Sequence, residues 1–225
     1  MNIATIIQAR MSSSRLPNKV LKSINGKPVI EYLIENIQYQ NSQIPIIVAT
    51  SKKETDRKIV NYCINHGIQY YEGDLLNVAS RFYEIIKIYK LDYFVRVCAD
   101  SPLLDGCIIK QLVNNIKDGT DIITNVMPRT FPKGQSVEVV RCKTFNSNFH
   151  KFKSDEDFEH VTRYFYNNIK SFNIMNIKNN KDLSSVNMSI DTKQDFNRIS
   201  RVIKKLESYH PKYSFNDLIN FYLDK

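Results

Sequence analysis

The sequence is poor in residues that interrupt a fold. It has six glycines and seven prolines in 225 residues, and neither forms a rich run, which excludes a low-complexity linker and a collagen-like repeat. It has no run of eighteen apolar residues that could span a membrane. The apolar N-terminal segment is too short, and lacks the basic start, for a signal peptide. We therefore expect a cytoplasmic protein with no membrane insertion.

Cysteine is also scarce. The four cysteines form no CxxC pair, and no histidine stands at zinc-finger spacing. We expect them to be reduced and mostly buried, because a chain of this length buries enough surface to need no disulfide or metal. With 42% hydrophobic and 24% charged residues, the composition is that of one globular domain. The cysteines are Cys63, Cys98, Cys107 and Cys142.

Acidic residues are absent from the first thirty positions, which hold five lysines and arginines. The whole chain has a net charge of +9, which favours an anionic partner but does not separate nucleic acid from nucleotide, phosphosugar or acidic membrane. The sequence has no RRM, KH or helix-turn-helix signature, and its basic residues gather in one loop rather than a stripe. We therefore expect no nucleic-acid partner.

Short β-branched runs alternate with segments of helical period over the first 126 residues. Nearly continuous apolar strands that alternate with helices predict a doubly wound, mostly parallel α/β sheet covered on both faces. Strands are predicted at 3–8, 44–50, 68–71, 93–99 and 121–126, and helices at 28–40, 54–66, 78–89 and 108–116.

The pattern changes after Met127. Strands are predicted at 136–140 and 186–190, with a long helical stretch between them that starts at Ser154. Helices are also predicted at 194–206, after Thr192, and from Ser214; each of the three starts has an aspartate three residues later. We expect one domain over 1–225, with 128–185 as a small inserted β/α portion.

Three segments can carry chemistry at the carboxyl ends of predicted strands, where open α/β sheets bind ligands. RMSSSRLPNK (10–19) joins three cations, three hydroxyls and several backbone N–H groups, a set suited to phosphate. Asp100 and Asp191 each follow an apolar strand. The alternatives are a solvated basic loop for 10–19 and capping roles for the aspartates. The loop matches neither the GxGxxG nor the GxxxxGK[ST] motif.

The sequence closely resembles the SpsF-like spore-coat polysaccharide cytidylyltransferases, which are akin to CMP-Kdo and CMP-acylneuraminate synthetases. The resemblance covers nearly the whole chain in the right order. It lies in IIQARMSSSRLPNKVLKSINGKPVIEYLI, IVATSKKETDRKIVNYC, VRVCADSPLLD, FPKGQSVEVV, DFEHVTRYF and SIDTKQDF. It implies a Rossmann-like nucleotidyltransferase fold of the nucleotide-diphospho-sugar transferase type.

The resemblance also implies site residues. The first loop would hold the triphosphate of CTP, and Asp100 and Asp191 would hold Mg²⁺, a cation that takes oxygen ligands. Ser12 and Asn18 stand where the family commonly has glycine; because asparagine tolerates the left-handed region, we expect the loop to survive. The nucleotide-binding residues implied are Ala9, Arg10, Ser13, Arg15, Lys19 and Arg81, and the catalytic ones are Arg10, Lys19 and Asp100.

On the acceptor side, the resemblance implies that His160 and Glu138 contact a sugar acid. Asn77 and Ser80 stand where the family commonly has acidic residues, and Ser136 where it often has aspartate, which leaves the sugar open. The triplet 155–157 spells the DxD motif of glycosyltransferases, but acids favour a helix start, and we assign it that role.

Together these features predict an enzyme that transfers CMP from CTP to a sugar acid and releases pyrophosphate. Two alternatives stay open: a guanylyl- or other nucleotidyltransferase acting on a sugar 1-phosphate, and a non-catalytic nucleotide-binding protein of polysaccharide assembly. A homodimer is implied by resemblance, with 128–185 as a candidate contact.

Overall fold

The computed structural model describes residues 1–206 and 209–224. Its centre is a seven-stranded sheet in the order β5-β4-β1-β6-β8-β7-β9. Neighbouring strands are parallel except in the two pairs that involve β8. The strands are β1 (Ile3–Gln8), β4 (Ile46–Ser51), β5 (Gln69–Gly73), β6 (Tyr93–Cys98), β7 (Ile122–Thr124), β8 (Glu138–Arg141) and β9 (Ile174–Asn176).

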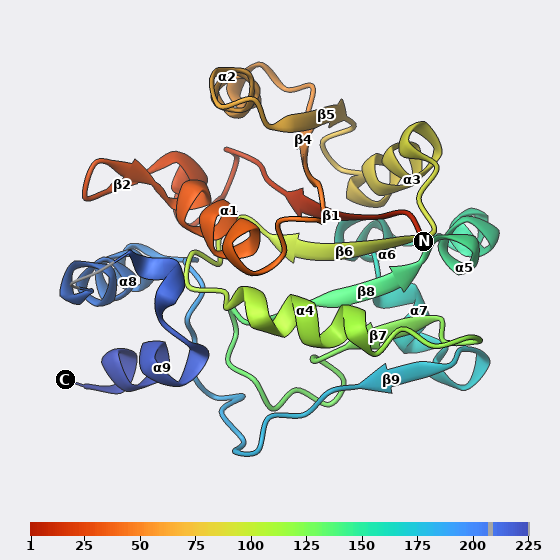
Figure 1. The fold of residues 1–225 in the computed structure, drawn as a ribbon. Helices are drawn as coiled ribbons and strands as arrows, with labels where there is room; N and C mark the ends of the chain where they lie inside the picture. The colour runs from red at the N-terminus through yellow and green to blue at the C-terminus, as the bar shows by residue number, and fades with distance from the viewer. Residues whose placement is uncertain (207–208, 225) are drawn as a thin grey trace.

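Helices cover both faces of this sheet, which confirms the predicted doubly wound architecture (Figure 1). In Figure 1, α1 and α4 lie in front of the sheet and α6 and α7 lie behind it. The front face carries α1 (Val29–Gln40), α2 (Arg57–Asn65), α4 (Gly106–Asn114), α8 (Lys193–Lys205) and α9 (Phe215–Leu223), and the back face carries α3 (Val78–Tyr89), α5 (Cys142–Asn148), α6 (Asp155–His160) and α7 (Arg163–Asn167).

Successive strand residues enter two different apolar cores. Ile6 and Ile7 on β1 are both fully buried, Ile6 under the helices of the back face and Ile7 under those of the front face. Phe94 and Val95 on β6 divide in the same way. Each such side chain contributes about 2–3 kcal/mol when it leaves water. Burial on both faces explains why these strands are almost continuously apolar.

A small hairpin, β2 (Ser23–Ile24) and β3 (Lys27–Pro28), was not predicted from periodicity. Its turn residues Asn25 and Gly26 have φ angles of 49° and 80°, as a type I′ turn requires, and the Asn-Gly pair is the sequence signal for one. Tyr32 on α1 donates a hydrogen bond to the Ile24 carbonyl at 2.8 Å. The hairpin therefore ties the loop after β1 to the start of α1.

The prediction of a strand at 186–190 is wrong. This segment makes one isolated bridge, Asn187 with Lys133, and backbone hydrogen bonds to Lys133, outside the sheet. Met188 and Ile190 are apolar because they enter the front core. The edge strand β9, which pairs with β7 on the side away from β8, lies inside the stretch predicted to be helical.

The prediction of a long helical stretch from Ser154 is also wrong. The segment divides into α6 and α7 at Val161, whose φ is 54°. The predicted helix starts are confirmed: capping boxes form at Ser154, Thr192 and Ser214. The acidic triplet 155–157 fills the first turn of α6, as expected from the helix dipole. Among the described residues, no helix has both the length and the apolar character needed to cross a membrane.

Candidate active site

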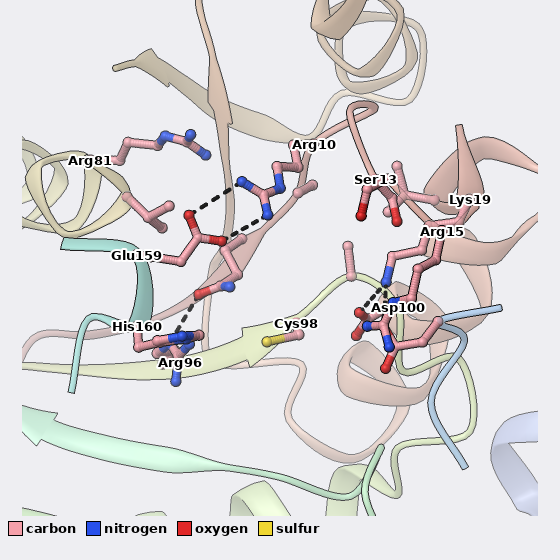
Figure 2. Close-up of a pocket in the computed structure, with 17 residues that line it drawn as sticks. Arg10, Ser13, Arg15, Lys19, Arg81, Arg96, Cys98, Asp100, Glu159 and His160 are labelled. Carbon is pink, nitrogen blue, oxygen red and sulfur yellow. Dashed lines mark hydrogen bonds and ion pairs between the residues drawn. The ribbon is translucent and has the colours of Figure 1, made fainter. Parts of the chain in front are cut away.

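A cavity of about 390 Å³ opens at the carboxyl ends of β1 and β6 (Figure 2). Segments far apart in the sequence form it: the loop after β1, the start of α3, the end of β6, the end of α6 and Asp191, two residues before α8. Most residues predicted for the site line this cavity. They are Ala9, Arg10, Ser13, Arg15, Lys19, Arg81, Asp100, His160 and Asp191.

The loop after β1 is held in shape by its own backbone. The Asn18 N–H donates to the Met11 carbonyl at 2.9 Å, and Asn18 has a φ of 61°. This left-handed residue is one that asparagine tolerates, which confirms the expectation that the loop survives without glycine there. A short 3-10 helix, Lys19–Leu21, follows and turns Lys19 back into the cavity.

Asp56, which was not predicted as a site residue, holds the start of the same loop at Met11. Its side chain is fully buried; one carboxylate oxygen accepts the Met11 N–H at 2.7 Å, and the other accepts the Ser51 hydroxyl. In the sequence, TDRK reads as an exposed helix start, so no local signal marks Asp56 as buried. Its position makes it a support for the loop rather than a wall of the cavity.

Asp56→Asn is expected to lower the free energy of unfolding by about 1–3 kcal/mol, because an amide cannot accept both hydrogen bonds and one buried group stays unsatisfied. That corresponds to a Tm lower by roughly 2–12 °C, together with a higher KM for an anionic substrate that this loop binds. Thermal unfolding and steady-state kinetics measure both. The exposed neighbour Glu54 provides the control Glu54→Gln. A normal Tm and KM in Asp56→Asn would remove the supporting role.

Lys19 contacts both Asp100 and Asp191, two aspartates that lie far apart in the sequence. Its ammonium lies 2.6 Å from Asp100 Oδ2, 3.1 Å from Asp191 Oδ1 and 2.8 Å from the Ile190 carbonyl. Burial alone would lower the pKa of Lys19, but the two carboxylates outweigh it and raise the pKa above its usual value. Arg15 also reaches Asp191 at 3.1 Å. The structure thus brings Asp100 and Asp191 together around one cation.

The two carboxylates form a donor set that fits a hard divalent cation, because both present oxygen atoms to a single positive charge. In the part of the chain that the structure describes, no group of three or more His, Cys, Asp or Glu side chains is placed to hold a metal. An ion here would therefore need further oxygens from a ligand, as Mg²⁺ commonly takes from phosphates.

Arg10 faces a carboxylate that sequence reasoning missed. Its guanidinium makes two hydrogen bonds to Glu159, at 2.7 and 3.3 Å, and both side chains are about one-third exposed. In Figure 2 this pair lies on the opposite side of the pocket from Lys19 and Asp100, with Cys98 between them. Glu159 comes from α6, so only the tertiary fold places it beside Arg10.

Arg81 lines the cavity but gives most of its hydrogen bonds to the backbone. It is 1% exposed and donates to the carbonyls of Asp74 and Leu75 at 2.7 and 2.8 Å. Burial lowers its pKa. Asn77 caps the start of α3 through the Ser80 N–H. Arg81 therefore anchors the 74–75 turn, and its contact with a nucleotide stays a prediction.

A row of polar side chains crosses four strands on the back face. Arg96 on β6 is the register partner of Glu138 on β8, which is the partner of Thr124 on β7. Gln8 on β1 lies two residues beyond Ile6, the partner of Arg96. Arg96 donates to Gln8 at 2.9 Å and forms an ion pair with Glu138. Burial lowers the pKa of Arg96, but the Glu138 charge outweighs it and raises the pKa. Arg96 lines the cavity and was not predicted.

Glu138 lies behind this arginine, outside the cavity wall. It is 4% exposed, and besides Arg96 it accepts hydrogen bonds from the hydroxyls of Thr162 and Tyr166. It reaches the cavity only through Arg96, and its contact with a substrate stays a prediction. His160, at the end of α6, does line the cavity.

Gly134 supports the segment that leads to Asp191. It has a φ of 91°, and a Cβ there would lie 2.5 Å from the Met188 carbonyl carbon. Gly119 has a similar φ of 80° with nothing within 4 Å of such a Cβ. Both glycines adopt the left-handed backbone, but only Gly134 of this pair is packed against the segment that leads to Asp191.

Gly134→Ala is expected to lower the free energy of unfolding by about 1–3 kcal/mol through backbone strain and to lower turnover, because the added methyl displaces residues 188–189. Gly119→Ala introduces the same backbone strain but displaces no neighbouring residue. It should therefore lower the stability and leave turnover unchanged. Chemical denaturation and turnover measured on both variants test the difference. Equal turnover in the two would show that the Met188 contact does not position Asp191.

A cation-rich loop and two converging carboxylates at a sheet's carboxyl edge are features suited to a polyphosphate and a divalent cation. Comparison with known sequences agrees, because the sequence model of the family described as Cytidylyltransferase matches residues 4–220. The chain belongs to this cytidylyltransferase family. Similar members include the spore coat polysaccharide biosynthesis protein SpsF of Bacillus subtilis strain 168, which is 28% identical over 97% of this chain and 92% of that protein.

Two further cytidylyltransferases extend the likeness. The 3-deoxy-manno-octulosonate cytidylyltransferase of Vesicomyosocius okutanii is 28% identical over 77% of this chain and 70% of its own length. The solved structure of a cytidylyltransferase from Leptospira borgpetersenii superposes with a TM-score of 0.92 at 25% identity, covering 98% of this chain and 93% of that one. The likeness therefore extends from sequence to the whole fold.

Proposed function

We propose that this cytidylyltransferase transfers CMP from CTP to the hydroxyl of a sugar acid and releases pyrophosphate. The observation that carries the proposal is the convergence of Asp100 and Asp191 on Lys19, at the end of a cavity whose first loop is rich in cations. The relatives named for spore coat polysaccharide biosynthesis and as a 3-deoxy-manno-octulosonate cytidylyltransferase support a sugar-acid acceptor and a role in surface polysaccharide synthesis.

In the proposed reaction, the acceptor oxygen attacks the α-phosphorus of CTP while the bond to the β-phosphate oxygen breaks. The hydroxyl proton passes to solvent and pyrophosphate leaves. Such a transfer needs positioning and charge neutralisation more than covalent help. Arg10, Arg15 and Lys19 would stabilise the leaving pyrophosphate, and Arg10 would exchange Glu159 for a phosphate oxygen. Ala9 and Ser13 line the same wall.

Asp100 and Asp191 would hold Mg²⁺, which neutralises triphosphate charge and polarises a bound oxygen when present. Lys19 would then turn from the carboxylates toward the phosphates. On the acceptor side, His160 faces the cavity, and Glu138 acts through Arg96. A homodimer with a contact from 128–185 stays a prediction, which the mass of the protein in solution would test.

The proposal is tested by pyrophosphate release with Mg²⁺, each of the four nucleoside triphosphates, and a panel of Kdo, neuraminate-like acids and sugar 1-phosphates. We expect release with CTP and a sugar acid. Release with GTP and a sugar 1-phosphate would favour the rival nucleotidyltransferase. Thermal stabilisation by nucleotide, with no release for any acceptor, would favour a non-catalytic nucleotide-binding protein.

A further inference from the structure

Arg96 lines the cavity with one guanidinium nitrogen that has no partner in the protein. In the part of the chain that the structure describes, every hydrogen bond of Arg96 comes from Nε, which donates to Gln8, or from Nη1, which donates to Glu138 and Thr162. Nη2 makes none, yet it is not an enclosed atom. The side chain keeps 13% of its surface exposed, so Nη2 has access to the cavity that Arg96 lines.

Two other arginines of the cavity use their nitrogens differently. Arg81 donates from all three guanidinium nitrogens to backbone carbonyls and is 1% exposed. Arg10 gives both of its Nη atoms to Glu159, and this pair is about one-third exposed. Arg96 therefore combines two features that neither of them shows together: a guanidinium held by partners on two strands, and a terminal nitrogen still available to a ligand.

The charge of Arg96 is already compensated. Glu138 pairs with it and also accepts the hydroxyls of Thr162 and Tyr166, so this buried ion pair is well hydrogen-bonded. Arg96 needs no further anion, and its Nη2 can donate to a neutral oxygen as well as to a charged one. The loop after β1 supplies the cations for a triphosphate, which leaves Arg96 for the second substrate.

The hydrogen bonds behind the cavity wall also connect Arg96 to the segment of His160. The Thr162 hydroxyl lies 3.5 Å from Arg96 Nη1 and donates to the His160 carbonyl at 3.3 Å. In Figure 2, Arg96 and His160 lie on the same side of the pocket, away from Lys19 and Asp100. One network thus holds two neighbouring parts of the cavity lining on the side opposite the convergent carboxylates.

We propose that Arg96 donates a hydrogen bond from Nη2 to an oxygen of the acceptor, and that Glu138 positions Arg96 to do so. The inference rests on the proposed function and names the residue that recognises its second substrate. A sugar acid offers carboxylate and hydroxyl oxygens, both of which accept from a guanidinium. Because Nε and Nη1 are held by Gln8 and Glu138, Nη2 has a fixed direction and selects an acceptor with an oxygen at that place.

The kinetic test uses Arg96→Met and the sugar acid from the panel that supports pyrophosphate release. The KM for the acid should rise by ~10- to 100-fold, the loss of one hydrogen bond from a charged donor, with an unchanged KM for CTP. Arg141→Met, on β8 but outside the cavity lining, is the control and should change neither.

A double variant guards against misfolding. Arg96→Met alone leaves Glu138 buried without its cation, which destabilises the protein, whereas Arg96→Met combined with Glu138→Gln removes both charges and should show the same rise in acid KM. Glu138→Gln alone should give a smaller rise, again without an effect on the KM for CTP. An unchanged acid KM in the folded double variant would overturn the inference.

Analogues of the acid distinguish direct contact from a structural role. The methyl ester and the single deoxy derivatives are compared in the wild-type protein and in the double variant. We expect one analogue to raise the KM of the wild type but not that of the double variant, because the partner of the missing oxygen is already lost. The ester would identify the carboxylate as that partner, and a deoxy derivative would identify a hydroxyl.

Additive effects for every analogue would show that Arg96 touches no acceptor oxygen and would overturn the inference. The two proposals fail in different ways. Pyrophosphate release with a sugar acid, together with an unchanged acid KM in the variants, overturns the role of Arg96 alone. If no sugar acid supports release, the proposed function fails and the inference fails with it.

Discussion

Asp100→Asn is expected to lower turnover with CTP by about 10²- to 10³-fold while the protein stays folded. The amide keeps the size of the side chain but loses the charge that meets Lys19 at 2.6 Å and faces Asp191 across the same ammonium. Without it, the site can neither hold a divalent cation through two carboxylates nor orient Lys19. Pyrophosphate release at saturating CTP and acceptor measures the loss.

The matched control is Asp118→Asn, which removes an exposed carboxylate far from the cavity lining. It should turn over normally. Far-ultraviolet circular dichroism shows whether each variant keeps its helices and sheet. A folded Asp100→Asn protein with near-normal turnover would exclude Asp100 from the mechanism and leave the convergence with Asp191 as a structural ion-pair network.

Lys19→Met is expected to lower turnover by a similar factor, about 10²- to 10³-fold, and to raise the KM for CTP. Lys19 is 9% exposed and is the shared partner of both aspartates. Methionine keeps much of the apolar stem but removes the charge that would stabilise the leaving pyrophosphate. Initial rates over a range of CTP concentrations separate the effect on turnover from the effect on binding.

The thermal stability of Lys19→Met provides a second test. Removing Lys19 leaves two carboxylates facing each other, so Tm should fall in Lys19→Met and recover in part when Asp191 is also changed to Asn. Lys22→Met, from the same loop, is the control, because Lys22 contacts the ring of Phe196 outside the cavity lining. A Lys19→Met protein with unchanged Tm and turnover would contradict the placement of its ammonium between the aspartates.

The fold could be predicted where one local rule decides the structure. Strands such as β1 and β6 are apolar on both sides because both of their faces are buried, and helix starts at Thr192 and Ser214 satisfy their own backbone through capping boxes. The site followed from the same reasoning, since Lys19 and Asp100 come after parallel strands that end at one edge of the sheet.

The remaining features depend on contacts that no local pattern encodes. Val186–Ile190 alternates like a strand, yet Met188 and Ile190 are apolar because of the core they enter. Asp56 and Glu159 stand in charged segments that resemble solvated helix surface, and only the tertiary fold brings them to Met11 and Arg10. Long-range charge pairing of this kind has no periodicity to detect.

The fate of the phosphates of CTP tests the central claim most directly. CTP labelled at the α-phosphorus or at the γ-phosphorus is incubated with the protein, Mg²⁺ and the sugar acid, and the products are separated. The account predicts that the α-label appears in the sugar nucleotide and the γ-label in pyrophosphate, in equal amounts. A γ-label on the sugar, or release of inorganic phosphate with the α-label left in CDP, would contradict transfer of CMP.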